Sequence, residues 1–199
     1  MPWLVIVAGP NGSGKTTLVR AGVVSAALPA PATSINADDI ARALAGGAQP
    51  APEQSLHAAQ RADALLDAEI EAGRSVVVET VLSSDKLRRR VAAAKAGGYE
   101  VALIYVTVRD GALNLLRVAQ RRAQGGHDVP AERVLARRTR SHDAFAWFAQ
   151  RADLVLVFDN TQAPVQAAGK LGGVWRLRAV DRLPPDLAAT VQRLAASGA

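Results

Sequence analysis

A glycine-rich octapeptide near the amino terminus combines the residue types that bind phosphate groups. It consists of Gly9, Pro10, Asn11, Gly12, Ser13, Gly14, Lys15 and Thr16, and Thr17 follows it directly. Glycine backbone can turn its N–H groups toward phosphate oxygens, and a lysine ammonium can reach the β- and γ-phosphates of a nucleotide. The Thr16 hydroxyl can hold Mg²⁺. This G-x-x-x-x-G-K-[ST] pattern, known as a P-loop or Walker A motif, predicts a site for ATP and Mg²⁺.

The sequence on either side of the octapeptide has the pattern that such a loop requires. Residues 3–8 form an apolar run of strand length, and a helical pattern begins at Lys15. The order strand, glycine-rich loop, helix places the positive end of the helix dipole at the phosphates. The alternative is a chance match in a chain with 16 glycines, and this context argues against it.

Acidic residues follow two other expected strands. Asp38 and Asp39 come just beyond the strand expected at 33–36, and Glu79 lies at the end of the apolar run 75–80. An acid in such a place can accept a proton from an attacking hydroxyl or hold a water bound to Mg²⁺. By position alone, a helix cap explains Asp38 equally well, and a solvated strand end is the alternative for Glu79. Glu79 stands in for a Walker B acid, which the sequence otherwise lacks.

Arginines recur on two expected helices, 111–124 and 131–150. Spacings of three and four residues place them on one face of each helix. Residues 125–130 between the helices contain glycines and a proline, which end one helix and start the next, and we interpret His127 as shaping this turn. A lid over about residues 111–145 would exclude water and bring guanidinium groups to the transferring phosphoryl group, whereas two solvated helix faces are the alternative. The polar residues of these faces are Asn114, Arg117, Arg121, Arg133, Arg137 and Arg140.

Elements that could position these residues alternate along the chain. Such alternation predicts an α/β fold, a parallel sheet sandwiched by helices, with the loops after the first three strands on one edge. We expect strands at 3–8, 33–36, 75–80, 100–108, 153–158 and 173–179. We expect helices at 15–27, 38–45, 53–72, 84–97, 111–124, 131–150 and 184–196. Residues 1–199 are expected to form one domain, which ends with the strand and helix of 173–199.

Composition restricts the class of protein. Hydrophobic residues make up 49% of the 199 residues, which argues for a folded chain, and no apolar run approaches the roughly 18 residues of a membrane span. The amino terminus lacks the basic region of a signal peptide, and the absence of cysteine excludes disulfides and thiolate catalysis, so we expect a cytoplasmic protein. The net charge of +6 suggests nucleic acid as a partner, but aromatic residues amount to only 4%, which makes base-stacking surfaces scarce.

Taken together, the motifs resemble those of the zeta-toxin-like P-loop kinases, a group that includes predicted ABC-type ATPases. The resemblance spans roughly residues 3–162, and its most specific part is Gly-Gly-His-Asp-Val-Pro at 125–130. The matching segments are the P-loop, 35–39, 79–83, 97–99, Arg117 with Val118, Arg121, 125–130, Arg137, 140–141 and 158–160. The chain departs from the usual motifs at Ala37 and Asp39, where Pro and Glu are usual, and at Arg138, where an aromatic residue is usual.

The resemblance implies a nucleoside-kinase-like sheet and ATP-dependent phosphorylation of a hydroxyl on a small molecule. In characterised zeta toxins, that molecule is a UDP-N-acetyl sugar, and an antitoxin protein is the partner. The resemblance also implies that Asp38 is the general base and that lid arginines, here Arg121 with Arg137 or Arg140, stabilise the transition state.

The acceptor is expected between Asp38 and Glu79, with residues 45–67 and 82–90 forming the rest of its pocket. Those two segments offer cations and hydrogen-bonding groups without an aromatic side chain, which suits UDP-N-acetylglucosamine better than a bare nucleoside. Two other functions stay open: an ATPase without an acceptor, and a nucleic-acid-binding protein regulated by ATP.

Overall fold

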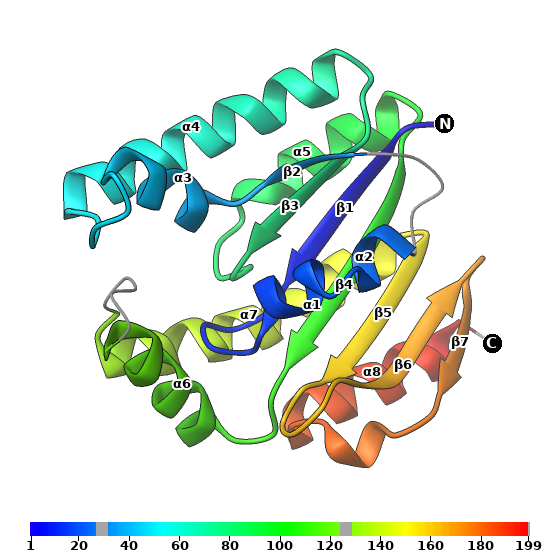
Figure 1. Ribbon diagram of the computed structural model, residues 1–199. Helices are drawn as coiled ribbons and strands as arrows, with labels where there is room; N and C mark the ends of the chain where they lie inside the picture. Colours follow the sequence, from blue (N-terminus) through cyan, green and yellow to red (C-terminus); the bar gives the residue numbers. More distant parts are fainter. Residues whose placement is uncertain (27–31, 124–128, 199) are drawn as a thin grey trace.

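The computed structural model describes residues 1–26, 32–123 and 129–198. Its elements alternate along the chain as the sequence predicts (Figure 1). The strands are β1 (Trp3–Ala8), β2 (Thr33–Ile35), β3 (Val76–Thr80), β4 (Glu100–Thr107), β5 (Leu154–Asp159), β6 (Val165–Leu171) and β7 (Val174–Leu177). The helices are α1 (Lys15–Arg20), α2 (Val23–Ala26), α3 (Ala37–Leu44), α4 (Pro52–Glu71), α5 (Lys86–Ala96), α6 (Gly111–Ala123), α7 (Ala131–Arg151) and α8 (Pro185–Ser197), with a 3₁₀ turn at Val180–Arg182.

The strands form one sheet in the order β2-β3-β1-β4-β5-β6-β7. The first five of these strands pair in parallel, which confirms the α/β fold with a largely parallel sheet. At one edge of the sheet, β6 and β7 are antiparallel. Residues 160–164 are all that connects β5 to β6, too short for the crossover that a parallel pair needs.

Two parts of the chain differ from the expected elements. Strand β6 lies where no strand was expected, and the helix expected at 15–27 is interrupted after Arg20. Gly22 explains the interruption, because its φ of 77° lies in the left-handed region where a helix cannot continue.

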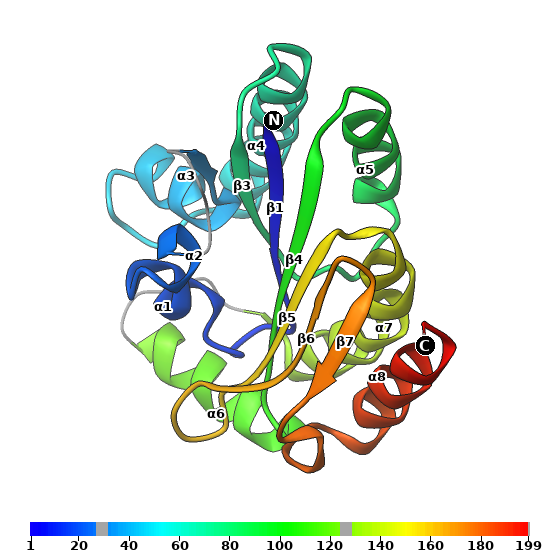
Figure 2. The ribbon, with the colours of Figure 1, turned by 90° about the vertical axis from the view of Figure 1, so that its right-hand side faces the viewer.

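The central strand β1 is buried from both sides, and residues Leu4 to Ala8 are all 0% exposed. Leu4 and Ile6 point into the larger core cluster, which α4, α5, α7 and α8 cover, while Val5 and Val7 point into a smaller cluster under α1 and α2. Figure 2 shows α1 and α2 on one side of the sheet and α5, α7 and α8 on the other. The continuous apolar run of β1 is what a strand with two buried faces requires.

The carboxyl ends of the parallel strands carry the polar segments that the sequence singles out. The glycine-rich loop follows β1, α3 starts after β2, and α6 follows β4. The register of β1 and β3 pairs Val7 with Glu79, so the Glu79 carboxylate lies beside the start of that loop. Of the residues that the structure describes, no helix combines the length and the apolar character needed to cross a membrane.

Candidate active site

The loop after β1 follows a path that requires glycine. Gly9 has a φ of 140°, and a Cβ atom built on it would lie 1.9 Å from the Val106 carbonyl oxygen. Gly14 has a φ of 93°, and its Cβ would lie 2.1 Å from the Asn160 side-chain nitrogen. At Gly9 the close neighbour is backbone, so another residue would displace the loop. At Gly14 another residue would adopt a strained backbone and displace the Asn160 side chain.

Two asparagines hold this loop, one in the helix that follows β4 and one directly after β5. The Asn114 Nδ2 atom in α6 donates to the Asn11 carbonyl at 2.7 Å, and the Asn160 Nδ2 atom after β5 donates to the Ser13 carbonyl at 2.8 Å. From its spacing, Asn114 is expected only on the arginine face of its helix, and no sequence pattern predicts either anchor. Only the packing of α6 and the end of β5 against the loop reveals them, because the contacts join residues more than 100 positions apart.

The Lys15 ammonium lies within the loop, where Nζ donates to the carbonyls of Gly9 at 2.8 Å and Pro10 at 3.0 Å. Burial lowers the pKa of Lys15 to about 8, because the protein removes water from the charged ammonium. The nearby Arg121 lowers the pKa further, while the carboxylates of Glu79 and Asp38 oppose the shift.

ATP binding is therefore expected to weaken at alkaline pH. Phosphate favours the charged ammonium, so above pH 8 a bound nucleotide must restore a proton that Lys15 has lost in the free protein. The dissociation constant for ATP should rise by up to about tenfold per pH unit above that value and change little below it. Calorimetric titrations between pH 7 and 9.5 measure this. Lys15→Arg keeps its charge at every pH and should lose the dependence, and an affinity of the natural protein that is constant up to pH 9.5 would contradict it.

The carboxylates expected near the loop have different partners. The Thr16 hydroxyl donates to Glu79 Oε2 at 2.8 Å. The Asp38 Oδ2 atom lies 3.5 Å from Arg121 Nη1, across from α6. Hydroxyl and carboxylate oxygens are the ligands that Mg²⁺ prefers, so Thr16 with Glu79 fits a magnesium ion.

Asp38 and its neighbour Asp39 make different contacts in the structure. The helix cap is Asn36, whose Oδ1 accepts from the Asp38 backbone N–H at 2.9 Å, so the Asp38 carboxylate is not used as the cap. Asp39 instead pairs with Arg42 at 2.9 Å and Arg20 at 3.7 Å. Asp38 is therefore the carboxylate of this pair that faces the site.

Arg121 has two nitrogens whose hydrogen-bonding capacity is unused. Nε and Nη2 are buried and have no hydrogen-bond partner among the described residues, and the same holds for Ser13 Oγ in the loop. A buried donor without a partner is costly, and an anionic oxygen would satisfy it. With Lys15 adjacent, these atoms fit the phosphate groups of a nucleotide.

The remaining predicted residues differ in their contacts and in their exposure to solvent. Arg117 Nη2 donates to the Thr161 carbonyl at 3.1 Å, beside the Asn160 anchor. Burial lowers the pKa of Arg137, with Arg133 and Arg140 contributing and Asp38 opposing, which places Arg137 within electrostatic reach of Asp38. Thr17 and Arg140 are exposed. Residues 125–128 of the predicted turn, including His127, lie outside the described residues, so the lid stays a prediction.

A cavity of about 180 Å³ adjoins Glu79. Helix α4 and the start of α5 provide its outer wall, within the segments expected to bind the acceptor. Its lining is Ile35, Ala37, Ala59, Ala62, Asp63, Leu66, Val78, Glu79, Thr80, Ser84, Lys86 and Leu87. This lining is more apolar than expected. Two polar residues of the segments 45–67 and 82–90 do not line the cavity. Gln54 accepts a hydrogen bond from the Ala51 backbone N–H at the start of α4, and Arg88 lies over the Trp147 ring.

Comparison with known proteins agrees with this architecture. Residues 4–145, well over half of the chain, match the model of a family described as an AAA domain. No curated protein matches the chain significantly.

Several solved structures share the fold. The AvrRxo1-ORF1:-ORF2 complex with ATP includes a chain that is 18% identical, with a TM-score of 0.68, and the match covers 100% of this chain and 77% of that one. A chain of the PezAT toxin–antitoxin system of Streptococcus pneumoniae is 14% identical, with a TM-score of 0.61 and coverages of 98% and 78%. A chain of the Pnkp1/Rnl/Hen1 RNA repair complex is 19% identical, with a TM-score of 0.56 and coverages of 74% and 46%. At these identities the likeness is one of fold.

Proposed function

The chain belongs to the AAA domain family, and on this premise we propose that it is an ATP-dependent phosphotransferase that phosphorylates a hydroxyl group of a small molecule. The observation that carries the proposal is the convergence of Lys15, Asp38 and Arg121 beside the glycine-rich loop, with two buried Arg121 nitrogens that have no hydrogen-bond partner among the described residues. A phosphate-binding loop alone is compatible with many activities. A carboxylate facing the phosphate position is what transfer to a hydroxyl additionally needs.

Each residue has a role that follows from its position. The loop N–H groups and Lys15 would bind the phosphates of ATP, and Thr16 with Glu79 would hold Mg²⁺. When bound, ATP·Mg²⁺ supplies the phosphoryl group to be transferred. Asp38 would accept the proton that the acceptor hydroxyl loses, and Arg121, together with Arg137 or Arg140, would stabilise the charge that develops on the phosphoryl oxygens.

For the acceptor, we propose a UDP-N-acetyl sugar such as UDP-N-acetylglucosamine, as the resemblance to zeta toxins implies. The cavity beside Glu79 is smaller than the ~300–1,000 Å³ that enclose drug-sized ligands. It would therefore hold the sugar ring that carries the reacting hydroxyl, with the nucleotide part outside. Lys86, at the cavity wall, offers a cation for the diphosphate.

We also propose an antitoxin protein as partner. The resemblance implies it, and PezAT, whose chain shares the fold, is a toxin–antitoxin system. Co-purification of an inhibitory protein, with loss of the phosphotransfer activity in the complex, would support this partner.

The test is a direct search for the product. Purified protein is incubated with ATP, Mg²⁺ and UDP-N-acetylglucosamine, and separately with a metabolite extract, and mass spectrometry detects molecules that gain one phosphate. A phosphorylated sugar nucleotide with an equal amount of ADP supports the whole proposal. Transfer to another metabolite only would retain the kinase and remove the sugar. Equal ATP consumption with and without acceptors would contradict the kinase proposal and support an ATPase. A steep salt dependence of DNA or RNA affinity would favour the nucleic-acid-binding alternative.

A further inference from the structure

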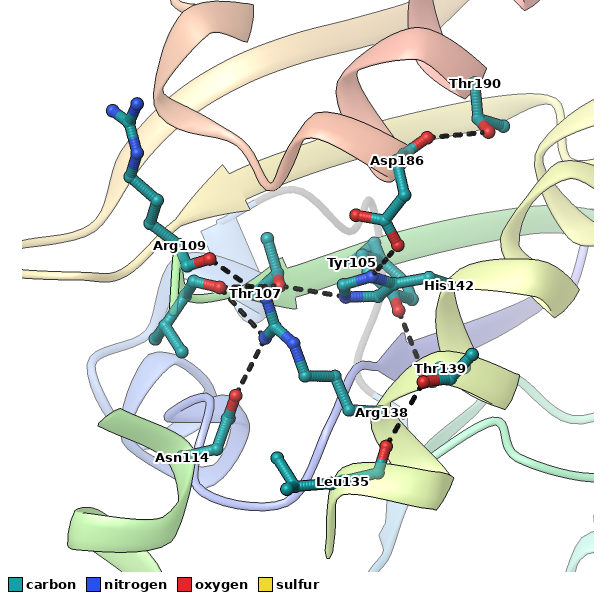
Figure 3. Close-up of polar contacts among 12 residues, drawn as sticks. Tyr105, Thr107, Arg109, Asn114, Leu135, Arg138, Thr139, His142, Asp186 and Thr190 are labelled. Atoms are coloured by element: carbon teal, nitrogen blue, oxygen red, sulfur yellow. Dashed lines mark hydrogen bonds and ion pairs between the residues drawn. The ribbon is translucent and has the colours of Figure 1, made fainter. Parts of the chain in front are cut away.

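We propose that Arg138 is a positioning residue, which fixes the phosphate-binding loop by holding the Asn114 side chain in one orientation. The connection runs from α7 through Arg138 to Asn114 in α6 (Figure 3). From Asn114 it continues to the Asn11 carbonyl in the loop. The structural part is independent of the reaction. Only its effects on ATP binding and catalysis rest on the proposed function.

Arg138 is committed to neutral oxygen atoms on the protein. Nη1 donates to Asn114 Oδ1 at 2.8 Å and to the Val108 carbonyl at 3.0 Å, and Nη2 donates to the Arg109 carbonyl at 3.1 Å. Burial lowers its pKa, and Asp186 opposes this at longer range. Burying half of a guanidinium costs desolvation free energy, and here two carbonyls and an amide are its partners instead of a carboxylate. This arrangement requires an explanation.

The Asn114 carboxamide supplies that explanation. Asn114 is 0% exposed, its Oδ1 accepts from Arg138, and its Nδ2 donates to the Asn11 carbonyl at 2.7 Å. A guanidinium can only donate, so Arg138 forces the amide oxygen toward itself and the amide nitrogen toward the loop. If the amide rotated by half a turn, two oxygens would face each other at Asn11 and two donors would face each other at Arg138.

The loop is sensitive to the position of Asn114. Asn11 directly precedes Gly12, and a Cβ atom on Gly12 would lie 2.7 Å from the Asn114 backbone oxygen. Helix α6 therefore packs closely against the loop at the place where Asn114 contacts it. A displaced Asn114 would shift the N–H groups that are to bind phosphate.

The other end of the connection is anchored in the core. One turn after Arg138, the buried His142 contacts Asp186 through Nδ1 at 2.6 Å and the Thr107 hydroxyl through Nε2 at 3.3 Å. Ser141 contacts the Tyr105 hydroxyl at 2.8 Å. These contacts hold α7 against β4 and α8. They fix the position of the Arg138 backbone, from which the side chain reaches α6 (Figure 3).

Two substitutions separate positioning from general stability. Arg138→Met keeps much of the side-chain volume but removes the donors, and Asn114→Asp keeps an acceptor for Arg138 while removing the donor to Asn11. Each should weaken ATP binding by about tenfold, as expected for one unpaired buried group. The thermal midpoint of Asn114→Asp should fall less than that of Asn114→Ala, because its carboxylate gains an ion pair with Arg138. Arg193→Met, on exposed α8 surface, is the matched control and should bind ATP normally.

The decisive measurement is a double-mutant cycle with calorimetric ATP affinities. In an Asn114→Ala background, Arg138→Met should have little further effect, because its influence passes through that amide. Effects that multiply independently, or an Asn114→Asp protein with normal ATP affinity, would overturn the proposal. Hydrogen exchange of residues 11–14 without nucleotide gives a second readout: faster exchange in both variants supports it even if the protein proves not to be a kinase, and unchanged exchange contradicts it.

Discussion

Replacing Lys15 with alanine is expected to abolish phosphoryl transfer, lowering kcat/KM by at least about 1,000-fold. The ammonium lies inside the loop, within electrostatic reach of Glu79, Asp38 and Arg121, so no other cation of the loop can take its place at the phosphates. Steady-state ADP formation with an acceptor measures the effect.

The fold of this variant should be intact. Burial disfavours the charged form of Lys15, as its lowered pKa shows, so removing the ammonium should not reduce the free energy of unfolding. Lys95→Ala is a suitable control, because Lys95 pairs with Asp153 and leaves the loop untouched. Normal turnover by Lys15→Ala would show that this loop is not the phosphate site.

The parts of the fold that sequence alone predicted depend on short-range patterns. Strand β1 and the loop after it are specified by an apolar run and by glycines at fixed spacing. Strand β6 was missed because Val165–Leu171 contains two alanines, a glycine and a lysine, with no clear alternation. A usable signal was present in Gly172 and Gly173, since adjacent glycines form tight hairpins, and both have positive φ here.

In the candidate site too, the sequence predicts the short-range features and not the long-range contacts. Sequence indicated the residue types at the strand ends, because parallel strands bring these ends to one edge. It could not indicate that Asn114 and Asn160 anchor the loop, or that Arg138 holds Asn114, since these contacts depend on how α6 and α7 pack. The departure from the resembled motif at Arg138 has a structural reason: in this chain the position supplies hydrogen-bond donors to α6.

The resemblance favours Asp38 over Asp39 as the base, and the structure adds contacts that support this choice. Adjacent acids after a strand are indistinguishable by composition, and a helix cap accounted for either one. With Asn36 as the cap and Asp39 paired to Arg42, only Asp38 is directed toward Arg121. This arrangement supports Asp38 as the proton acceptor and defines a matched pair of variants.

Asp38→Asn is expected to lower kcat by about 100-fold or more, the usual contribution of a positioned proton acceptor. The amide retains the size of the carboxylate but cannot take the proton of the acceptor hydroxyl. ATP affinity should change little, because Asp38 contacts Arg121 and the substitution leaves Lys15 and Thr16 in place. Single-turnover rates with saturating ATP separate this chemical defect from a defect in binding.

Asp39→Asn is the control for the same experiment, since it changes the neighbouring residue by the same atoms. Asp39 is about half exposed, and its pairs with Arg20 and Arg42 lie on the surface, where such pairs contribute little. Its kcat should therefore stay within about twofold of the natural protein. If Asp39→Asn proved the more damaging of the two, the base would be Asp39, and the Asp38–Arg121 contact would have to be explained as a structural ion pair. If neither substitution slowed the reaction, hydroxyl deprotonation would not depend on this pair, and the phosphotransfer mechanism proposed above would have no base.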